Sequence, residues 1–197
     1  MTSEEKVKVF EKELGYIKDN NIRKFTEEVI KILPDYFFII ASSSTGKYHP
    51  KFALGEGGLL RHTKAAVQIG MDLLQQEMFQ KYTDNEKDII IASLIPHDGV
   101  KHGVVQQQYS VAEHPKLIVE YIKKHKEICE ILNSTILEKI LDCIHSHMGM
   151  YNTDYRTKKE ILPKPKTKLE NFVHLCDYLS SRKYFEEFNF DIDIIRK

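Results

Sequence analysis

Apolar residues recur every three and four positions along most of the chain, which is the spacing of one face of an α-helix. This pattern predicts helices over the ranges 4–18, 22–33, 58–80, 86–97, 111–132, 134–148 and 167–185. Pro34 ends the second helix, and a break near His125 would divide the fifth. The segment FFII, residues 37–40, is the single candidate for a strand. The pattern therefore predicts an all-α fold.

Two long polar segments separate the predicted helices. Residues 41–58 are rich in serine and glycine, whereas residues 149–166 are basic and contain two prolines. A chain of 197 residues fits one domain with a small appendage. We expect residues 1–40 to form a helical extension packed on the core, residues 41–185 to form the main domain, and residues 186–197 to form a C-terminal tail.

Composition narrows the class of protein. The 29 basic and 29 acidic residues give a net charge of zero, which does not indicate a broad nucleic-acid-binding surface. No stretch approaches the roughly 20 apolar residues of a membrane span, and the charged N-terminus lacks the apolar core of a signal peptide. The three cysteines are odd in number and lie mostly in apolar stretches, which favours buried free thiols. We therefore expect a cytoplasmic protein without a membrane partner.

The segment FFIIASSSTGKYH, residues 37–49, superficially resembles a strand that runs into a phosphate-binding loop. Such a loop needs a glycine five residues before its Gly-Lys pair, and Ser or Thr after the lysine to hold magnesium. This chain has Ala41 and Tyr48 at those positions. The segment therefore does not match a P-loop.

Nine histidines are the unusual feature of the composition. Residues three and four positions apart share a helix face, and on this basis polar side chains from five predicted helices turn inward. They are His62, His97, Asp98, His114, His147 and Asp177. One inward histidine is usually a hydrogen-bonded core residue, and one inward aspartate can cap a helix.

Burying this many polar groups is unfavourable unless they satisfy one another or bind a common ligand. Imidazole and carboxylate ligands suit Mn, Fe, Ni, Zn and similar divalent ions better than Ca. Helical bundles commonly build such sites in the core from side chains on facing helices. The sequence therefore favours a metal site.

The remaining histidines are weaker candidates. His49 lies in the serine- and glycine-rich segment and His102 follows the turn after Asp98, so both could face a substrate. His145 points away from His147 on a continuous helix and would join the site only if the helix ended near Ser146. We interpret the others as surface or core residues, namely His125 and His174.

The order of His62, the pair His97-Asp98, and Asp177 resembles the H…HD…D signature of the HD-domain metal-dependent phosphohydrolases. Further segments are similar to relatives of the YhaM type, which are 3′-to-5′ exoribonucleases: GGLLRHT (57–63), HDGVK (97–101), EHP (113–115), SHMG (146–149) and CDYLSSR (176–182). The resemblance covers about residues 45–185. It implies that residues 41–185 form an HD domain, a helical bundle with the metal site in its core.

The resemblance also implies the chemistry. One ion would be held by His62, His97, Asp98 and Asp177, and Asp98 would bridge to a second ion held by His114 and His147. The ions would be divalent transition metals, Mn, Fe, Ni, Co or Zn rather than Mg. Two ions about 3.5–4 Å apart can share and activate a hydroxide that attacks phosphorus. The implied substrate is a phosphoester in a nucleotide, cyclic nucleotide or short oligonucleotide.

Several residues are candidates for substrate contacts. Lys101, three residues after Asp98, is placed to touch a phosphate or the attacking water, and we assign Asp98 and Lys101 to catalysis. Candidates for phosphate contacts are Lys47, Arg61, Arg156 and Arg182; Tyr151 or Tyr155 could stack on a base; and His49, His102 and His145 could face the substrate. Each has an ordinary alternative as a solvated or packed side chain.

Two departures separate this chain from those relatives. Many relatives have two adjacent histidines where this chain has His147-Met148, so a ligand of the second ion is missing or is supplied by His145 or water. The relatives typically carry a nucleic-acid-binding OB domain ahead of the HD domain, whereas residues 1–40 look like two helices. The second departure favours a standalone phosphohydrolase over a processive exoribonuclease.

Two other functions stay open at this point. Some HD-fold proteins are di-iron oxygenases, which would contain iron and consume oxygen. A third alternative is a non-catalytic, metal-stabilised module that binds a nucleotide, RNA or a protein, with the basic 156–168 stretch and the C-terminal tail as contact surfaces. The sequence leaves open whether the chain forms a homo-oligomer.

Overall fold

The computed structural model describes residues 1–47 and 49–183. Its α-helices are α1 (Ser3–Val9), α2 (Glu11–Leu14), α3 (Asn20–Ile32), α4 (Gly58–Leu74), α5 (Asp84–Leu94), α6 (His114–Lys124), α7 (Lys126–Cys129), α8 (Ser134–Ser146) and α9 (Lys168–Ser180). Short 3-10 helices are η1 (Asp35–Phe38), η2 (Lys51–Ala53), η3 (Glu77–Phe79) and η4 (Gly149–Tyr151). The described residues contain no strand, only an isolated bridge between Thr153 and Glu160. The predicted all-α fold is confirmed.

The differences from the predicted elements are local. The first predicted helix divides at Phe10 into α1 and α2, and the fifth breaks at His125 as expected. The candidate strand at 37–40 is wrong. Tyr36, Phe37 and Phe38 instead belong to η1, the 3-10 helix that follows Pro34, and are buried in the core.

Local sequence explains where several helices begin. Three of them start with a capping box, in which a threonine and a glutamate three residues later satisfy each other's backbone N–H groups. The pairs are Thr2 with Glu5, Thr83 with Glu86, and Thr167 with Glu170. A fourth helix, α3, begins at Asp19, whose carboxylate accepts from the N–H groups of Asn21 and Ile22.

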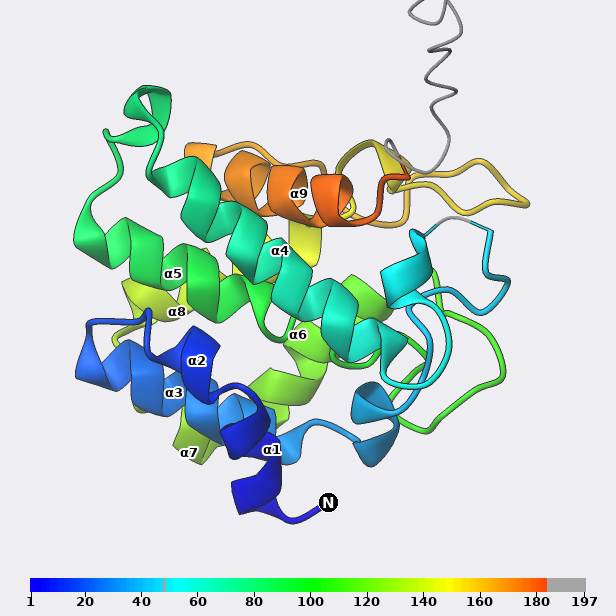
Figure 1. The fold of residues 1–197 in the computed structure, drawn as a ribbon, viewed down its shortest axis with the longest axis horizontal. Helices are drawn as coiled ribbons and strands as arrows, with labels where there is room; N and C mark the ends of the chain where they lie inside the picture. The colour runs from blue at the N-terminus through cyan, green and yellow to red at the C-terminus, as the bar shows by residue number, and fades with distance from the viewer. Residues whose placement is uncertain (48, 184–197) are drawn as a thin grey trace, which may run out of the picture.

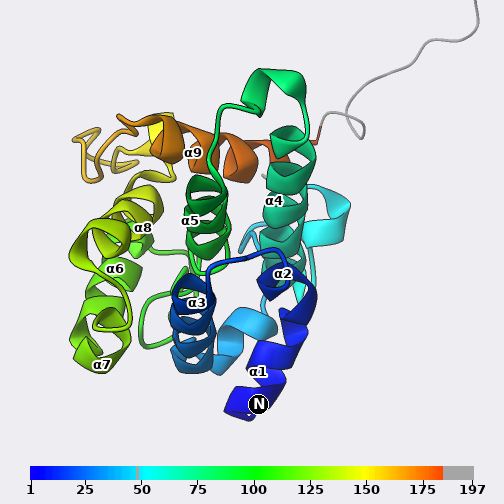
Figure 2. The same ribbon diagram turned by 90° about the vertical axis from the view of Figure 1, so that its left-hand side faces the viewer.

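Helix α5 lies at the centre of the molecule. It packs against α3 on one side and against α4, α8 and α9 on the others, as Figures 1 and 2 show. Every residue from 88 to 100 is buried, so the chain is enclosed through the end of α5 and the turn that follows. The side chain of Asp88, at the start of this stretch, accepts hydrogen bonds from the backbone of Lys18 and Asp19.

One continuous apolar core joins the N-terminal helices to the rest. Phe10, Phe25 and Phe37 are completely buried in the same cluster as Ile90 and Phe172. The predicted extension at 1–40 therefore shares its core with the main body, while the predicted tail at 186–197 lies outside the described residues. Among the helices that the structure describes, none is both long enough and apolar enough to cross a membrane.

The long connections between helices gather at one end of the molecule. Residues 39–47, 49–57, 95–113 and 147–167 form loops and short 3-10 turns on the same side of the bundle, to the right of the helices in Figure 1. The helix ends that meet there carry most of the histidines and aspartates singled out in the sequence.

Candidate metal centre

The pair His97-Asp98 follows α5 directly, in a turn that leaves no room for a larger residue at position 99. A Cβ atom on Gly99 would lie 2.6 Å from Leu33 Cδ2. Both His97 and Asp98 are buried, with exposed fractions of 0% and 1%. The tight turn thus places two polar side chains in the interior at the end of the most enclosed helix.

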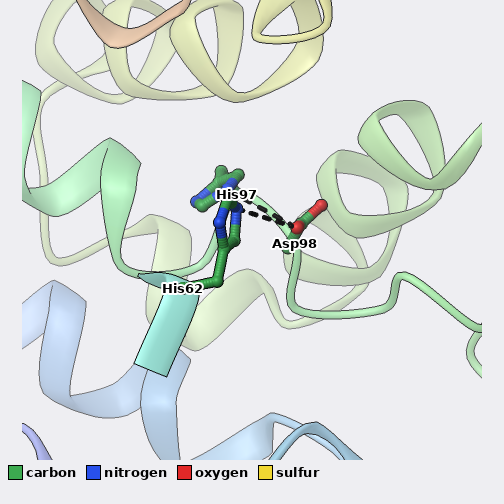
Figure 3. Close-up of side chains that lie close together, drawn as sticks. All are labelled: His62, His97 and Asp98. Carbon is green, nitrogen blue, oxygen red and sulfur yellow. Dashed lines mark ion pairs between the residues drawn. The ribbon is translucent and has the colours of Figure 1, made fainter. Parts of the chain in front are cut away.

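Polar side chains from four further elements surround this pair. His62 comes from the second turn of α4, His114 from the first residue of α6, and His147 from the residue that caps the end of α8. Asp177 comes from α9. Figure 3 shows the imidazoles of His62 and His97 lying together and facing the carboxylate of Asp98.

Hydrogen bonds fix which nitrogen of three imidazoles faces the centre. In each, Nδ1 lies against the backbone carbonyl three residues earlier, and a carbonyl can only accept, so Nδ1 carries a proton and Nε2 has the lone pair in the neutral imidazole. The Nδ1–oxygen distances are 2.6 Å for His97 and Leu94, 2.8 Å for His114 and Val111, and 2.7 Å for His147 and Ile144.

His62 has the same tautomer for a different reason. Its Nδ1 lies 3.1 Å from Ser180 Oγ, and that hydroxyl already donates to the carbonyl of Asp177 at 2.8 Å. Ser180 must therefore accept from His62, which leaves the lone pair on Nε2 as well. Four histidines thus turn their Nε2 atoms toward one region.

The two oxygens of Asp98 divide these histidines into pairs. Oδ2 lies 3.6 Å from Nε2 of both His62 and His97. Oδ1 lies 2.8 Å from Nε2 of His114 and 3.7 Å from Nε2 of His147. A single carboxylate thus stands between two histidine pairs, with one oxygen facing each. On the side of His62 and His97, Asp177 Oδ1 adds a second carboxylate oxygen at 3.0 and 3.4 Å.

The residues fit a divalent metal ion. Ligand atoms about 2.0–2.2 Å from one ion, at tetrahedral or octahedral angles, are about 3.0–3.6 Å apart, and the distances that join His62 and His97 to the two aspartates lie in that range. Among the described residues, Nε2 of His62 and of His97 are buried without a hydrogen-bond partner. Asp177 Oδ1 lies only 3.0 Å from Nε2 of His62, although each atom turns a lone pair toward the other. A cation bound between them would relieve this repulsion.

Three groups of residues have ligand atoms that all lie within 4.8 Å of one another. They are His62 with His97 and Asp98, His97 with His147 and Asp177, and Asp98 with His114 and His147. The structure therefore brings together the six residues that the sequence placed at the metal site. These buried groups could hold a metal ion; their geometry alone fixes neither its identity nor the number of ions.

Charges within the cluster shift its pKa values in opposite directions. Burial lowers the pKa of His62 and of His114, although the neighbouring carboxylates oppose it. For His97 burial is outweighed by Asp98 and Asp177, which together raise its pKa. Burial raises the pKa of both carboxyls, but nearby histidines, and Lys101 in the case of Asp98, hold it well below the usual range. Both aspartates are therefore ionised and offer negative charge to a cation.

Lys101 lies at the edge of the cluster. Its Nζ is 2.5 Å from Asp98 Oδ2, the oxygen that also faces His62 and His97, and its side chain is 11% exposed. The ammonium therefore reaches the centre and also borders the space in front of it.

A pocket of about 670 Å³ opens over the cluster. Its lining combines polar groups of the centre with residues of the surrounding loops and of α9: His49, Asp98, Lys101, Ser110, Val111, Ala112, His114, Met148, Tyr151, His174, Asp177, Tyr178, Ser181 and Arg182. Of the candidates for substrate contacts, His49, Lys101, Tyr151 and Arg182 line this pocket. Burial lowers the pKa of His49 to about 3, so its imidazole is neutral.

The other candidates lie elsewhere. Arg61 donates to the carbonyls of Phe52 and Leu54 and so holds the loop before α4. His102 Nδ1 bonds to the carbonyl of Gln107 at 3.0 Å. Helix α8 does end at Ser146, but His145 joins neither the cluster nor the pocket lining. The exposed residues Lys47, Arg156 and Tyr155 do not line the pocket.

Sequence reasoning missed the contribution of α9 to the pocket wall. His174, Tyr178 and Ser181 follow one another at spacings of four and three residues, so they share one face at the end of α9, beside Asp177. The guanidinium of Arg182 lies 4.5 Å from the ring centre of Tyr178. Counting helical positions outward from Asp177 would have identified these residues.

Fold and site define the class: an all-helical protein with a buried histidine–aspartate cluster that could bind metal beside an open pocket. No protein-family model matches the chain, and neither the curated proteins nor the solved structures contain a significant match. The resemblance to HD-domain phosphohydrolases therefore stays a prediction, and the functional argument rests on the residues themselves.

Proposed function

We propose that the protein is a divalent-metal-dependent phosphohydrolase that acts on a phosphoester of a nucleotide, cyclic nucleotide or short oligonucleotide. The observation that carries the proposal is the position of Asp98, whose two oxygens face two histidine pairs at the floor of an open pocket. One ion would be held by His62, His97, Asp98 and Asp177, and a second by Asp98, His114 and His147.

Bound ions would supply a water of lowered pKa and positive charge opposite the phosphate oxygens. The chain's own residues prepare the site for an anion. The carbonyl bonds of His97, His114 and His147 hold Nδ1 against the backbone and turn Nε2 inward, so the negative charge of the cluster comes from the two aspartates. Two divalent ions would outweigh that negative charge. The site would then be positive and would attract an anion such as a phosphate.

The pocket wall suits the rest of such a substrate. Lys101 stands where it can move from Asp98 to a phosphate oxygen and hold the substrate in place. Tyr151 and Tyr178 add aromatic surface, and Arg182 adds a second positive charge. A volume of about 670 Å³ falls within the usual range for small-molecule sites. These features favour a phosphoester with a planar group attached.

The proposal is tested by hydrolysis assays on metal-free protein reloaded separately with Mn, Fe, Co, Ni or Zn. The panel contains bis(p-nitrophenyl) phosphate, mononucleotides, cyclic nucleotides and oligonucleotides of two to five residues. We expect turnover that requires metal and is lost in Asp98→Asn, which keeps the side-chain shape but removes the charge shared between the histidine pairs. Lys101→Met should raise KM or lower kcat while leaving metal content unchanged.

Other results point to other functions. Two bound ions without hydrolysis of any phosphoester would contradict the proposal. Under that outcome, iron with oxygen consumption would identify an oxygenase, and tight nucleotide binding without turnover would identify a binding module. Full activity of Asp98→Asn would exclude the buried cluster as the source of the reaction.

A further inference from the structure

The end of α8 is held in place by a side chain from another helix. His147 caps α8, so its carbonyl lies past the last turn of that helix, where backbone partners run out. His174 on α9 supplies the donor: its Nδ1–H bonds to the carbonyl of His147 at 2.7 Å. A pocket-lining histidine thus bonds to the backbone of a residue in the metal cluster.

The chain turns sharply against the face of this imidazole. Gly149 has φ +57, a left-handed conformation that favours glycine. A Cβ atom at this position would lie 2.2 to 2.5 Å from three ring atoms of His174. The turn after α8 and the ring of His174 therefore fit together only because residue 149 has no side chain.

The contacts of His174 with His147 and Gly149 act on one half of the cluster. The ring of His147 is fixed by its Nδ1 bond to Ile144, and its Nε2 lies 3.3 Å from Nε2 of His114 and 3.7 Å from Asp98 Oδ1. Releasing the carbonyl of His147 frees the backbone that carries this ring. The side of Asp98 that faces His62 and His97 has its own support, because Ser180 fixes His62.

We infer that His174 is a positioning residue for the second metal position, formed by Asp98 Oδ1, His114 and His147. The inference rests on the proposed metal centre. His174 acts through the backbone of His147, so its loss weakens the binding of one ion and spares the other. Residues that orient metal ligands typically change metal affinity about 10- to 100-fold when they are replaced.

The experiment titrates metal-free protein with Mn²⁺ or Co²⁺ alone and measures the number of ions and the affinity of each class by calorimetry. Three variants separate the hydrogen bond from packing. In His174→Asn the amide nitrogen occupies the position of Nδ1 and keeps the donor. His174→Gln carries the same amide one bond further out, and His174→Phe keeps the ring without any donor.

We expect wild type and His174→Asn to bind two ions. His174→Gln and His174→Phe should bind the first ion with unchanged affinity and the second about 10- to 100-fold more weakly. A role in packing alone predicts the reverse, with Phe close to wild type and Asn impaired. Unfolding midpoints of the metal-free variants show whether each one folds.

The inference is overturned if His174→Phe binds both ions as wild type does, if both affinities fall together, or if wild type binds only one ion. Failure of the proposed function looks different: a wild-type protein that binds two ions and hydrolyses no phosphoester. In that case the response of the second ion to His174→Phe would still support the positioning role.

Discussion

Two parts of this molecule are equally buried and are held together by opposite chemistry. Around the N-terminal helices, Phe10, Phe25 and Phe37 have no exposed surface and contact other apolar side chains. In the candidate metal centre, His62 and His97 also have no exposed surface, but they face each other and two carboxylates. Helix α5 belongs to the apolar core, and the turn that follows it carries His97 and Asp98.

The comparison shows that burying a side chain can either stabilise or destabilise the fold, depending on the chemistry of that side chain. In the aromatic part, each ring removed from water stabilises the fold by itself. In the cluster, buried imidazoles and carboxylates lose their contacts with water. Only contacts with one another or with a bound cation can replace them. The aromatic part therefore needs no ligand to be stable, whereas a cation bound at the proposed metal site would stabilise the cluster.

The largest effect should come from metal. A divalent ion at one hundred times its Kd should raise the free energy of unfolding by about 2.7 kcal/mol per site, or about 5 kcal/mol for two sites. Denaturant titrations of metal-free and reloaded protein would measure this gain. Asp98→Asn should abolish it, because this carboxylate serves both histidine pairs. Equal stability of the two wild-type forms would contradict the dependence of the cluster on a cation.

Removing a ring from the aromatic part should have the next largest effect. Phe25→Ala should lower the free energy of unfolding by about 3–5 kcal/mol, the usual loss for a buried phenylalanine. The number of bound ions should not change, because the aromatic core is stable without them. Urea titration together with elemental analysis of the folded protein tests both statements. Loss of metal in this variant would mean that the two parts are not independent.

Gly149→Ala should affect stability and the centre together. The left-handed backbone and the contact with His174 should lower the free energy of unfolding by about 1–3 kcal/mol, and the second ion should bind more weakly. Gly55→Ala is the matched control, because Gly55 has φ +67 but no atom within 4 Å of its added Cβ. If both variants kept the wild-type number of ions, the turn after α8 would have no part in the centre.

The smallest effect concerns the link between α8 and α9. Glu170 accepts from Ser146, from Thr167 and from the backbone of Lys166. Burial alone would raise the pKa of the Glu170 carboxyl. The hydrogen-bond donors outweigh burial, so this pKa lies below the usual 4.5. Replacing Glu170 with Gln should lower the free energy of unfolding by about 1 kcal/mol at neutral pH.

The pH dependence of this last effect has a definite sign. A carboxylate with a lowered pKa contributes its full stabilisation above the unfolded value of 4.5 and loses it as the pH falls through the lower folded pKa. The difference between wild type and Glu170→Gln should therefore be constant above pH 4.5 and shrink below it. Thermal unfolding at pH 3 and pH 7 would measure it, and an equal difference at both would refute the assignment.

Much of the fold and the cluster could be predicted because both follow from helical spacing. His62 and His114 lie on apolar stripes, and stripes turn inward whatever the tertiary arrangement. His97 and Asp98 follow an apolar run that proves to be buried on all sides. No sequence pattern, however, shows that Asp98 divides its oxygens between two histidine pairs, because that depends on where four separate helices cross.

The wrong and missed assignments have tertiary causes. Residues 37–40 have strong strand propensity, but Phe37 and Phe38 lie in a 3-10 turn, with their rings against each other and against Phe10. Arg61 was a candidate for phosphate contact, and its guanidinium binds loop carbonyls whose position no local pattern encodes. The end of α8 depends on Gly149 fitting against His174, a contact between residues 25 positions apart.

The enclosure of residues 88–100 has a consequence for how the centre comes apart. Backbone amides in such a segment exchange with solvent only through the largest openings of a protein, whereas helix ends and loops exchange through small local ones. His97 and Asp98 lie in this protected segment, while His114 begins a helix that follows an exposed loop. We therefore expect partial unfolding to release His114 before His97 and Asp98, which should stay in place until the largest openings occur.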